Sequence, residues 1–437
     1  MPTKTMRYSG WGRALWAESA VARPERMAGL ERQMAEAPAP AFGMLRSYGD
    51  VCLNDGGRAI NMARLDRMMA FDAETGQITV EAGVRIGDLA RALAPRGWLP
   101  AVMPGTGFAT VGGAIANDVH GKNHHIAGSF GQHVRKISLI TPKGAKTATP
   151  KKGKELFEAT VGGMGQTGVI ATAELQLIPT KGDVVMVTER RIADWDEHLE
   201  RLNASDAPYS VGWIDATATG AALGRGILEE GETGSGLVPP QKRVKKVPFD
   251  APGFALAPPV VRAFNAAYWR RVPAHGRTLV KRIRDFFFPL DKILEWNRLY
   301  GKAGFHQFQC VVPLGGADAL KSMLEMIARA GAASPLAVLK RMGPGRGGLM
   351  SFPMEGYTLA VDFHASTATE RLVKRLEDAT LEAGGRIYLA KDSLAGAGAA
   401  QAMYPDHKKW AQICAKHDPD GALQTDLMRR LNLRGAP

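Results

Sequence analysis

The first 180 residues alternate short apolar runs with glycine-containing turns. Residues 77–83 and 136–140 have the composition of β-strands. Between them, residues 86–94 follow the pattern of a helix. Short strands broken by glycine turns, with a helix between two of them, predict an α+β domain in this N-terminal part.

The pattern changes beyond Pro179, where Ala, Pro and basic residues become more frequent. Further strand-like runs and helical patterns then alternate, at 305–312, 358–363 and 386–390 for strands and at 317–330 and 369–383 for helices. This alternation predicts a second α+β unit, a sheet covered on one side by helices. Residues 402–433 predict helices with charged faces, whereas the Gly, Pro and Lys content of 231–252 predicts a mobile loop.

The length and the cysteine content limit the class of protein. A chain of 437 residues is too long for one ordinary core, so we expect two domains with a functional cleft between them. The apolar runs fall short of the roughly 18 to 20 residues of a membrane span, and the N-terminus has no apolar signal core. Cys52, Cys310 and Cys414 are too few and too scattered for a disulfide framework or a CxxC metal site. We therefore expect a cytoplasmic protein.

The net charge of +13 raises the question of an anionic partner. Nucleic-acid binding requires clustered basic residues, but here they are scattered, with modest concentrations at 242–246 and 277–284. No basic-aromatic module accompanies them, which argues against a nucleic-acid-binding protein. An evenly solvated basic surface, an anionic substrate and an anionic membrane surface all stay open.

Three glycine-rich segments, 46–50, 104–125 and 161–170, carry the strongest chemical signal. Glycine lets backbone N–H groups approach a pyrophosphate closely, because no Cβ intervenes and positive φ is allowed. Neither a G-x-G-x-x-G turn that opens a long helix nor a P-loop motif occurs, so Rossmann and P-loop sites are disfavoured. Three separate glycine clusters suit a long dinucleotide that lies through a groove.

The order of these three segments resembles the PCMH-type FAD-binding domain of the vanillyl-alcohol-oxidase superfamily. The stretch HGKNHHIAGSFGQHV at 120–134 resembles the branch of that superfamily that acts on polyprenyl-phosphoryl ribose. Further matches to this branch run along nearly the whole chain, at 213–216, 262–265, 286–291, 296–298, 307–309 and 390–393. The resemblance implies an FAD-binding domain at 1–181, a substrate-binding domain at 182–385 and a segment at 386–437 that returns to the FAD-binding domain.

The same resemblance assigns the FAD contacts. The residues implied are Arg46, Ser47, Tyr48, Gly49, Asp50, Pro104, Gly105 and Thr106 at the pyrophosphate, Gly112, Gly113, Ala116, His120, Tyr388 and Lys391 near the flavin, and Gly165 and Ile170 near the adenosine. Many superfamily members bond the flavin to a histidine of the first loop. Asp50 stands at that position, so we predict noncovalent FAD.

Two side chains are the candidate catalytic residues. His120 is expected against the flavin, where it could orient the ring or contact the reacting hydroxyl. Lys391 is expected across the cleft, where its ammonium could bind the hydroxyl or the flavin. If burial lowers its pKa, Lys391 could instead act as a base, and the sequence leaves this open. The nearby histidines have no acidic or thiol partner in the pattern, so we expect no metal.

Polar residues of the second domain are the candidate substrate contacts. Gln307 and Gln309 share one face of a strand by its period of two, and paired amides suit the hydroxyls of a sugar. Lys340, Asp362 and Trp213 are further candidates for the pocket. Related actinobacterial enzymes have a cysteine where this chain has Ala360, and hydride transfer does not require that thiol.

The implied reaction is hydride transfer from C2 of polyprenyl-phosphoryl-β-D-ribose to flavin N5, which gives the 2-keto sugar. The expected partner is a short-chain NAD(P)H-dependent reductase that completes a ribose-to-arabinose epimerisation for cell-envelope arabinan precursors. The aromatic run 286–290, the basic stretch before it and the loop at 231–252 suit a lipid-linked substrate and peripheral contact with an anionic inner membrane, while a partly buried helix and a solvated loop stay the alternative. The alternative is a soluble alditol or lactone oxidase that acts on a free sugar alcohol.

Overall fold

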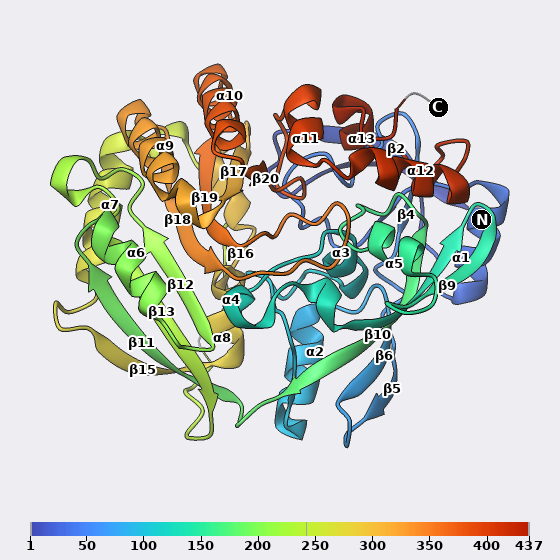
Figure 1. Ribbon diagram of the computed structural model, residues 1–437, viewed down its shortest axis with the longest axis horizontal. Helices are drawn as coiled ribbons and strands as arrows, with labels where there is room; N and C mark the ends of the chain where they lie inside the picture. Colours follow the sequence, from blue (N-terminus) through green and yellow to red (C-terminus); the bar gives the residue numbers. More distant parts are fainter. Residues whose placement is uncertain (1, 242, 436–437) are drawn as a thin grey trace.

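A computed structural model describes residues 2–241 and 243–435. Figure 1 shows the N-terminal strands and the C-terminal helices together on one side and a large sheet on the other. The N-terminal residues form a four-stranded sheet of order β1-β2-β4-β3, built from β1 (Thr3–Ser9), β2 (Trp16–Ala22), β3 (Ala41–Phe42) and β4 (Arg58–Asn61). Helix α1 (Met27–Glu36) connects β2 to β3 and buries Leu30 and Met34 in the core.

A six-stranded sheet follows, in which β10 is the central strand. Its path is β5-β6-β10-β8-β9, and β7 also pairs with β10; the strands are β5 (Met68–Asp72), β6 (Gln77–Glu81), β7 (Trp98–Pro100), β8 (Val134–Thr141), β9 (Gly144–Ala148) and β10 (Val169–Pro179). The helices of this part are α2 (Ile86–Leu93), α3 (Val111–Ala116), α4 (His124–Ala127) and α5 (Lys154–Thr160). The strands and the helix expected near residues 77–94 and 136–140 are therefore present.

The chain then forms an eight-stranded sheet of order β15-β11-β13-β12-β18-β19-β17-β20. Its strands are β11 (Val184–Ile192), β12 (Tyr209–Ile214), β13 (Gly226–Gly234), β15 (Arg277–Arg282), β17 (Phe305–Val312), β18 (Ala333–Met342), β19 (Gly356–His364) and β20 (Arg386–Ile387). Every residue of β17 is buried. This burial shows that both faces of the sheet are covered at β17.

Helices pack on both faces of this sheet. Three of them lie on one face, α6 (Trp195–Ala204), α9 (Ala317–Ala330) and α10 (Thr367–Glu382). Helix α7 (Pro258–Arg270) lies on the other face, because Tyr268 packs its ring 4.7 Å from that of Trp213, whereas the adjacent Gly212 faces His198 of α6. The expected one-sided cover thus holds for three helices, and α7 adds cover on the second face.

Two predicted elements, a loop and a strand, differ from the structure. The run 231–252 is not one loop, since β13 continues to Gly234 and β14 (Lys245–Lys246) pairs in parallel with β16 (Ile293–Leu294). Lys242, part of a basic concentration in the sequence, lies outside the described residues. The strand expected at 386–390 ends at Ile387, because the chain turns there and the amide of Lys391 donates to the carbonyl of Tyr388.

The C-terminal residues form α11 (Ala397–Met403), α12 (His407–His417) and α13 (Asp426–Leu431). They pack against the N-terminal part, where Trp410 Nε1 donates to the carbonyl of Ala159 at 3.0 Å. Arg430 of α13 pairs with Asp50. Both ends of the chain therefore contribute to one packed region (Figure 1). Among the described helices, none is long and apolar enough to cross a membrane.

Candidate active site

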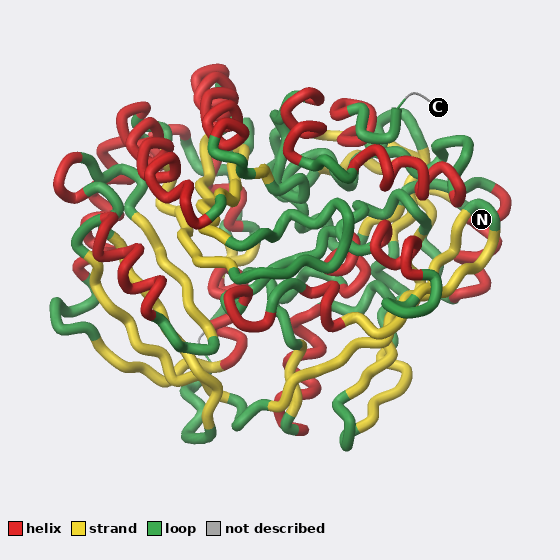
Figure 2. The backbone as a smooth tube through the Cα atoms, in the orientation of Figure 1, coloured by secondary structure: helices red, strands yellow, loops and turns green. Residues whose placement is uncertain are grey.

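A cavity of about 790 Å³ lies between the glycine-rich loops and one face of the eight-stranded sheet. This is the face on which α7 packs, and it is called the open face below. Its volume falls in the upper part of the range of about 300–1,000 Å³ that is usual for ligand sites. Figure 2 shows loops gathered between the two sheet-containing parts, and these loops carry much of the cavity lining. The cavity is therefore built by segments that are far apart in the sequence.

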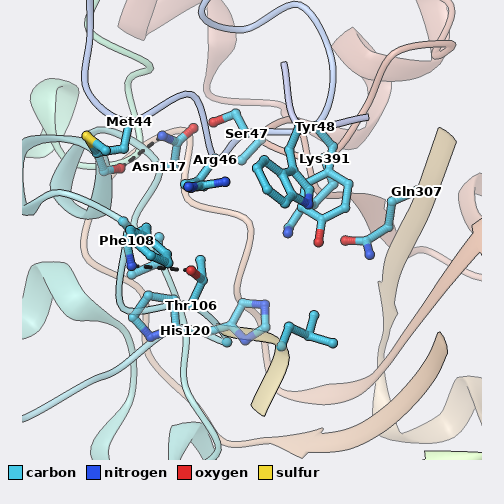
Figure 3. Close-up of a pocket in the computed structure, with 18 of the residues that line it drawn as sticks. Met44, Arg46, Ser47, Tyr48, Thr106, Phe108, Asn117, His120, Gln307 and Lys391 are labelled. Atoms are coloured by element: carbon cyan, nitrogen blue, oxygen red, sulfur yellow. Dashed lines mark hydrogen bonds between the residues drawn. The ribbon is translucent and has the colours of Figure 1, made fainter. Parts of the chain in front are cut away.

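Most of the residues predicted for the site line this one cavity. They are Arg46, Ser47, Tyr48, Pro104, Gly105, Thr106, Gly112, Gly113, Ala116, His120, Gly165, Ile170, Trp213, Gln307, Gln309, Lys340, Tyr388 and Lys391. Gly49, Asp50 and Asp362 do not line it. Figure 3 shows Arg46, His120, Gln307 and Lys391 around a shared open space.

Strand pairing sets the positions of the polar side chains on the sheet. In the register of β17 and β19, Gln307 lies opposite Asp362, and Gln309 lies opposite Ala360. Gln307 and Gln309 line the cavity, whereas Phe308 packs in the core under the helices. The two amides thus share one face, as the period of a strand requires.

His120 is bound by protein groups at both ring nitrogens. Lys340 Nζ lies 3.0 Å from Nδ1, and the side-chain amide of Gln309 lies 2.9 Å from Nε2. The amide nitrogen of Gln309 donates to Nε2 and to the Thr358 hydroxyl, so Nδ1 is the ring nitrogen that faces Lys340. Burial, together with the charge of Lys340, lowers the pKa of His120 well below its usual value. His120 is therefore a neutral imidazole near neutral pH.

Two lysines with lowered pKa values lie on this cavity. Burial lowers the pKa of Lys340 to about 7, and the charge of Lys122 acts in the same direction. Burial also lowers the pKa of Lys391, while the nearby Asp362 carboxylate partly opposes this effect. Lys391 Nζ lies 3.5 Å from the centre of the Tyr48 ring. Near neutral pH both amines are thus able to take up or release a proton.

Asp362 lies beside Gln307 on the neighbouring strand but does not line the cavity. Its carboxylate accepts hydrogen bonds from the amide of Gln307 and from the hydroxyl of Tyr300, and the side chain is fully buried. Burial raises the pKa of Asp362. The expectation that Asp362 contacts the substrate is corrected on this point, because its carboxylate is taken up by Gln307 and Tyr300.

The first glycine-rich loop places one cation in the cavity. The guanidinium of Arg46 lies 4.0 Å from the ring centre of Trp11 and 4.6 Å from that of Phe108. Its buried Nε has no hydrogen-bond partner within the described residues. An unpartnered N–H on a cavity-lining arginine is suited to an anion.

Comparison with known proteins identifies the family. Residues 30–149 match the FAD binding domain family. The chain is 38% identical to decaprenylphosphoryl-β-D-ribose oxidase from Mycolicibacterium smegmatis, over 99% of this chain and 98% of that protein. The chain belongs to the decaprenylphosphoryl-β-D-ribose oxidase family. It is an FAD-dependent oxidoreductase, so the predicted cofactor and the predicted α+β class are confirmed.

More distant relatives include enzymes that are named for lactones. An uncharacterised protein from Streptomyces coelicolor is 33% identical over 79% of this chain and 99% of its own length. L-gulono-1,4-lactone dehydrogenase from Mycobacterium tuberculosis is 22% identical over 97% of this chain and 98% of its own. This lactone enzyme thus aligns with nearly the whole chain, but at much lower identity than the M. smegmatis enzyme.

The residues of the cavity fit FAD. A Cβ added to Gly105 or Gly165 would meet nothing within 4 Å, so the backbone at both positions borders open space. A Cβ on Gly113 would meet only the hydroxyl of Thr110, at 3.2 Å. Bare backbone along a groove, with an unpartnered Arg46 N–H beside it, matches the needs of a pyrophosphate.

Gly49 and Asp50 have a structural position instead of the expected place in the groove. The Asp50 carboxylate accepts from Arg430 Nε and Nη2, both at 2.8 Å. Gly49 packs against the backbone of Asp392, where a Cβ has no room. These contacts join the first loop to the C-terminal segment and turn both residues away from the cavity.

Of the three histidines after His120, two have separate partners, whereas neither ring nitrogen of His124 has a hydrogen-bond partner within the described residues. Nε2 of His125 lies 2.9 Å from the carbonyl of Ala207, and Nε2 of His133 lies 2.8 Å from that of Ala127. His124 is buried, and its pKa is lowered to about 4 by burial and by Lys340. Within the described residues, no group of three or more His, Cys, Asp or Glu could hold a metal ion.

Sequence reasoning missed the far wall of the cavity. Lys122, Glu229, Tyr268 and Arg271 line it together with Trp213. Lys122 could have been predicted as a cavity residue, because it follows the candidate His120 by only two positions. Arg271, just beyond α7, and Glu229, on β13, carry no local signal, because only the packing of α7 on the sheet brings them together.

Proposed function

We propose that this enzyme oxidises the C2 hydroxyl of a polyprenyl-phosphoryl-β-D-ribose to the 2-keto sugar. The observation that carries the proposal is the chain Lys340–His120–Gln309 on the wall of the cavity, with Lys391 on the same cavity. Amide and ammonium groups placed in this way can donate hydrogen bonds to the hydroxyls of a sugar, and the amine of Lys391 can take up the proton of the reacting hydroxyl. The name of the M. smegmatis relative supports this substrate class.

Alcohol oxidation removes a hydride from carbon and a proton from oxygen. FAD, when bound, supplies the hydride acceptor. Burial lowers the pKa values of Lys391 and Lys340 alike; we assign the base to Lys391, because Lys340 Nζ is already hydrogen-bonded to His120. His120 is less suited, since protein groups already engage both of its nitrogens. We assign Lys340, held in place by His120, to binding and orienting the hydroxyl, and Gln307 and Gln309 to the other sugar oxygens.

The direct test is anaerobic mixing of the holoenzyme with a polyprenyl-phosphoryl ribose while the visible flavin band is followed. Bleaching and formation of a 2-keto sugar are expected. Bleaching by free xylitol or by a free lactone, without bleaching by the phosphoryl sugar, would overturn the proposal. It would favour the alternative of an alditol or lactone oxidase.

Lys391→Met in the same assay tests the proposed base. We expect the rate of bleaching to fall on the order of 10²-fold or more, while the bound FAD is retained. Thr358→Val offers a matched control, since Thr358 also lines the cavity but supplies no ionisable group. Equal effects of the two substitutions would contradict the assignment of Lys391.

The lipid part of the substrate calls for an apolar exit from the cavity. The aromatic run 286–290, expected to contact lipid, does not provide it, because Phe286, Phe287 and Phe288 are buried in the core. Ile293 and Leu294 of β16 line the cavity and are also 40% and 37% exposed. On segments nearby, Phe249 and Phe254 are 69% and 73% exposed; η4 (Gly253–Leu256) packs against η6 (Trp296–Tyr300), just beyond β16. We assign this surface, 245–256 with 293–300, to the polyprenyl chain and to peripheral contact with an anionic inner membrane.

Two partner expectations accompany this assignment. Sedimentation with vesicles of anionic lipid, compared with neutral vesicles, tests the membrane contact; Phe249→Ser with Phe254→Ser should release the protein. A short-chain NAD(P)H-dependent reductase is the proposed consumer of the 2-keto sugar, completing the ribose-to-arabinose epimerisation in a cytoplasmic or peripheral membrane location. Adding such a reductase with NADH should convert the product to the arabinose epimer.

A further inference from the structure

The far wall of the cavity carries an ion network that neither the FAD contacts nor the proposed oxidation step uses. Val211 lies opposite Glu229 in the sheet, and Gly212 lies opposite Leu339, so Val211 stands between Glu229 and Lys340. Two strand spacings of roughly 4.8 Å place Glu229 on the order of 10 Å from Lys340 across the sheet. This distance is within reach of a substituent on a sugar that is bound at Lys340.

The network contains more positive than negative charge. Its carboxylates are Glu189 and Glu229, and its cations are Lys122, Arg271, Arg277 and Lys281. Lys281 Nζ contacts both carboxylates, at 2.9 and 3.0 Å. Burial raises the pKa of Glu229, but Lys122 and Lys281 outweigh this effect and lower it to about 2. Four cations against two carboxylates leave a surplus of two positive charges on this wall.

Two of the cations face the ligand space, Lys122 and Arg271. Lys122 Nζ lies 3.9 Å from the ring centre of Phe286 and 3.5 Å from Glu229. Arg271 donates through Nη1 to Glu189 and through Nη2 to the Tyr268 hydroxyl. Its Nε is buried and has no hydrogen-bond partner within the described residues. The carboxylates thus hold both cations in place without neutralising them.

We propose that Lys122 and Arg271 form the subsite for the phosphoryl group of the substrate. A phosphodiester brings one negative charge and several acceptor oxygens, which match an ammonium and a free guanidinium N–H. The inference rests on the proposed function and adds what distinguishes the lipid-linked sugar from a free alditol or lactone. The pyrophosphate of FAD has its own candidate cation in Arg46, on the first glycine-rich loop.

The test uses the holoenzyme of three variants, Lys122→Gln, Arg271→Gln and Arg277→Gln. The first two should raise KM for a short polyprenyl-phosphoryl ribose by roughly 10- to 100-fold, as expected for a lost hydrogen bond to a charged group. Arg277 belongs to the same network but does not line the cavity, so Arg277→Gln is the matched control. It should change KM by less than about 3-fold, as a charge at longer range does.

Two measurements separate the sources of an effect. Flavin content after purification should stay equal in all variants, because a loss would assign the cations to FAD. The ratio of kcat/KM for the phosphoryl ribose to that for methyl β-D-riboside should fall in Lys122→Gln and Arg271→Gln. Unchanged ratios, or equal effects of all three substitutions, would overturn the subsite.

A binding assay keeps the inference testable if the proposed reaction fails. Hexyl phosphate is titrated into the oxidised holoenzyme by calorimetry, in wild type and in each variant. Binding that is lost in Lys122→Gln and Arg271→Gln, but kept in Arg277→Gln, supports the anion subsite even without turnover of a ribose. No binding to the wild type, or equal binding to all variants, would refute it.

Discussion

Replacing Asp362 by asparagine should shift the pH dependence of flavin reduction to lower pH. Burial lowers the pKa of Lys391, and the charge of Asp362 opposes that effect. Reduction of the flavin should therefore increase with pH as Lys391 loses its proton, with a limb near neutral pH. The Asp362→Asn substitution removes the opposing charge, so the pKa of Lys391 falls further and the free amine persists to lower pH.

The size of the shift can be worked out from Coulomb's law for two charges set about 6 Å apart, beyond direct contact. Among the ion pairs of the described residues, none joins Lys391 to Asp362, so the two charges act beyond direct contact. Two unit charges about 6 Å apart interact by about 1.4 to 2.8 kcal/mol at an effective dielectric constant of about 20 to 40. Since burial raises the pKa of Asp362, it is only partly ionised near pH 7, and we expect a shift of about 1 pH unit.

The assay is anaerobic stopped-flow bleaching of the flavin over a range of pH, in wild type and in Asp362→Asn. The introduced amide keeps one oxygen that can accept from Gln307, and its nitrogen can donate to the hydroxyl oxygen of Tyr300, so both local contacts can be kept. Tyr300→Phe is the control, because it removes one of these hydrogen bonds and no charge; it should shift the limb by clearly less. An unmoved limb in Asp362→Asn, or a shift to higher pH, would refute the link between the two residues.

Three further predictions concern the cofactor and the open face of the sheet. FAD should be released intact by acid, because Asp50 cannot form a histidyl bond and is held by Arg430; flavin fluorescence that stays with the precipitated chain would contradict this. Arg46→Ala should yield protein with less FAD after dialysis, with an increase in Kd on the order of 10-fold for a lost charge-assisted contact, measured by flavin fluorescence; an unchanged Kd would remove Arg46 from the pyrophosphate site. Ala360→Cys should leave sugar oxidation nearly unchanged but allow labelling by electrophiles that form on flavin turnover, since Ala360 lines the cavity beside Gln309. If mass spectrometry finds no adduct at this position despite an active flavin, residue 360 does not face the flavin as proposed.

Local patterns predicted the elements whose structure depends on near neighbours. Strand β17 and helix α9 occupy the predicted ranges 305–312 and 317–330, because the spacing of apolar residues alone decides which side of a strand or helix is buried. The same period placed Gln307 and Gln309 on one face. The glycine-rich segments were likewise recognisable, since bare backbone at a ligand needs a glycine wherever the chain later folds.

Contacts between distant segments were decided only by tertiary structure. Lys340 and His120 are 220 residues apart in the chain, and Asp50 and Arg430 are 380 apart. The sequence shows the residue types but not the distances, so it could not tell that Asp50 would pair with Arg430 or that Gln307 and Tyr300 would take up the Asp362 carboxylate. The lowered pKa values of Lys340 and Lys391 arise from burial when the loops cover the sheet. The charge surplus at Lys122 and Arg271 likewise exists only because α7 packs on the open face of the sheet, since an electrostatic environment depends on distance through space and not on separation along the chain.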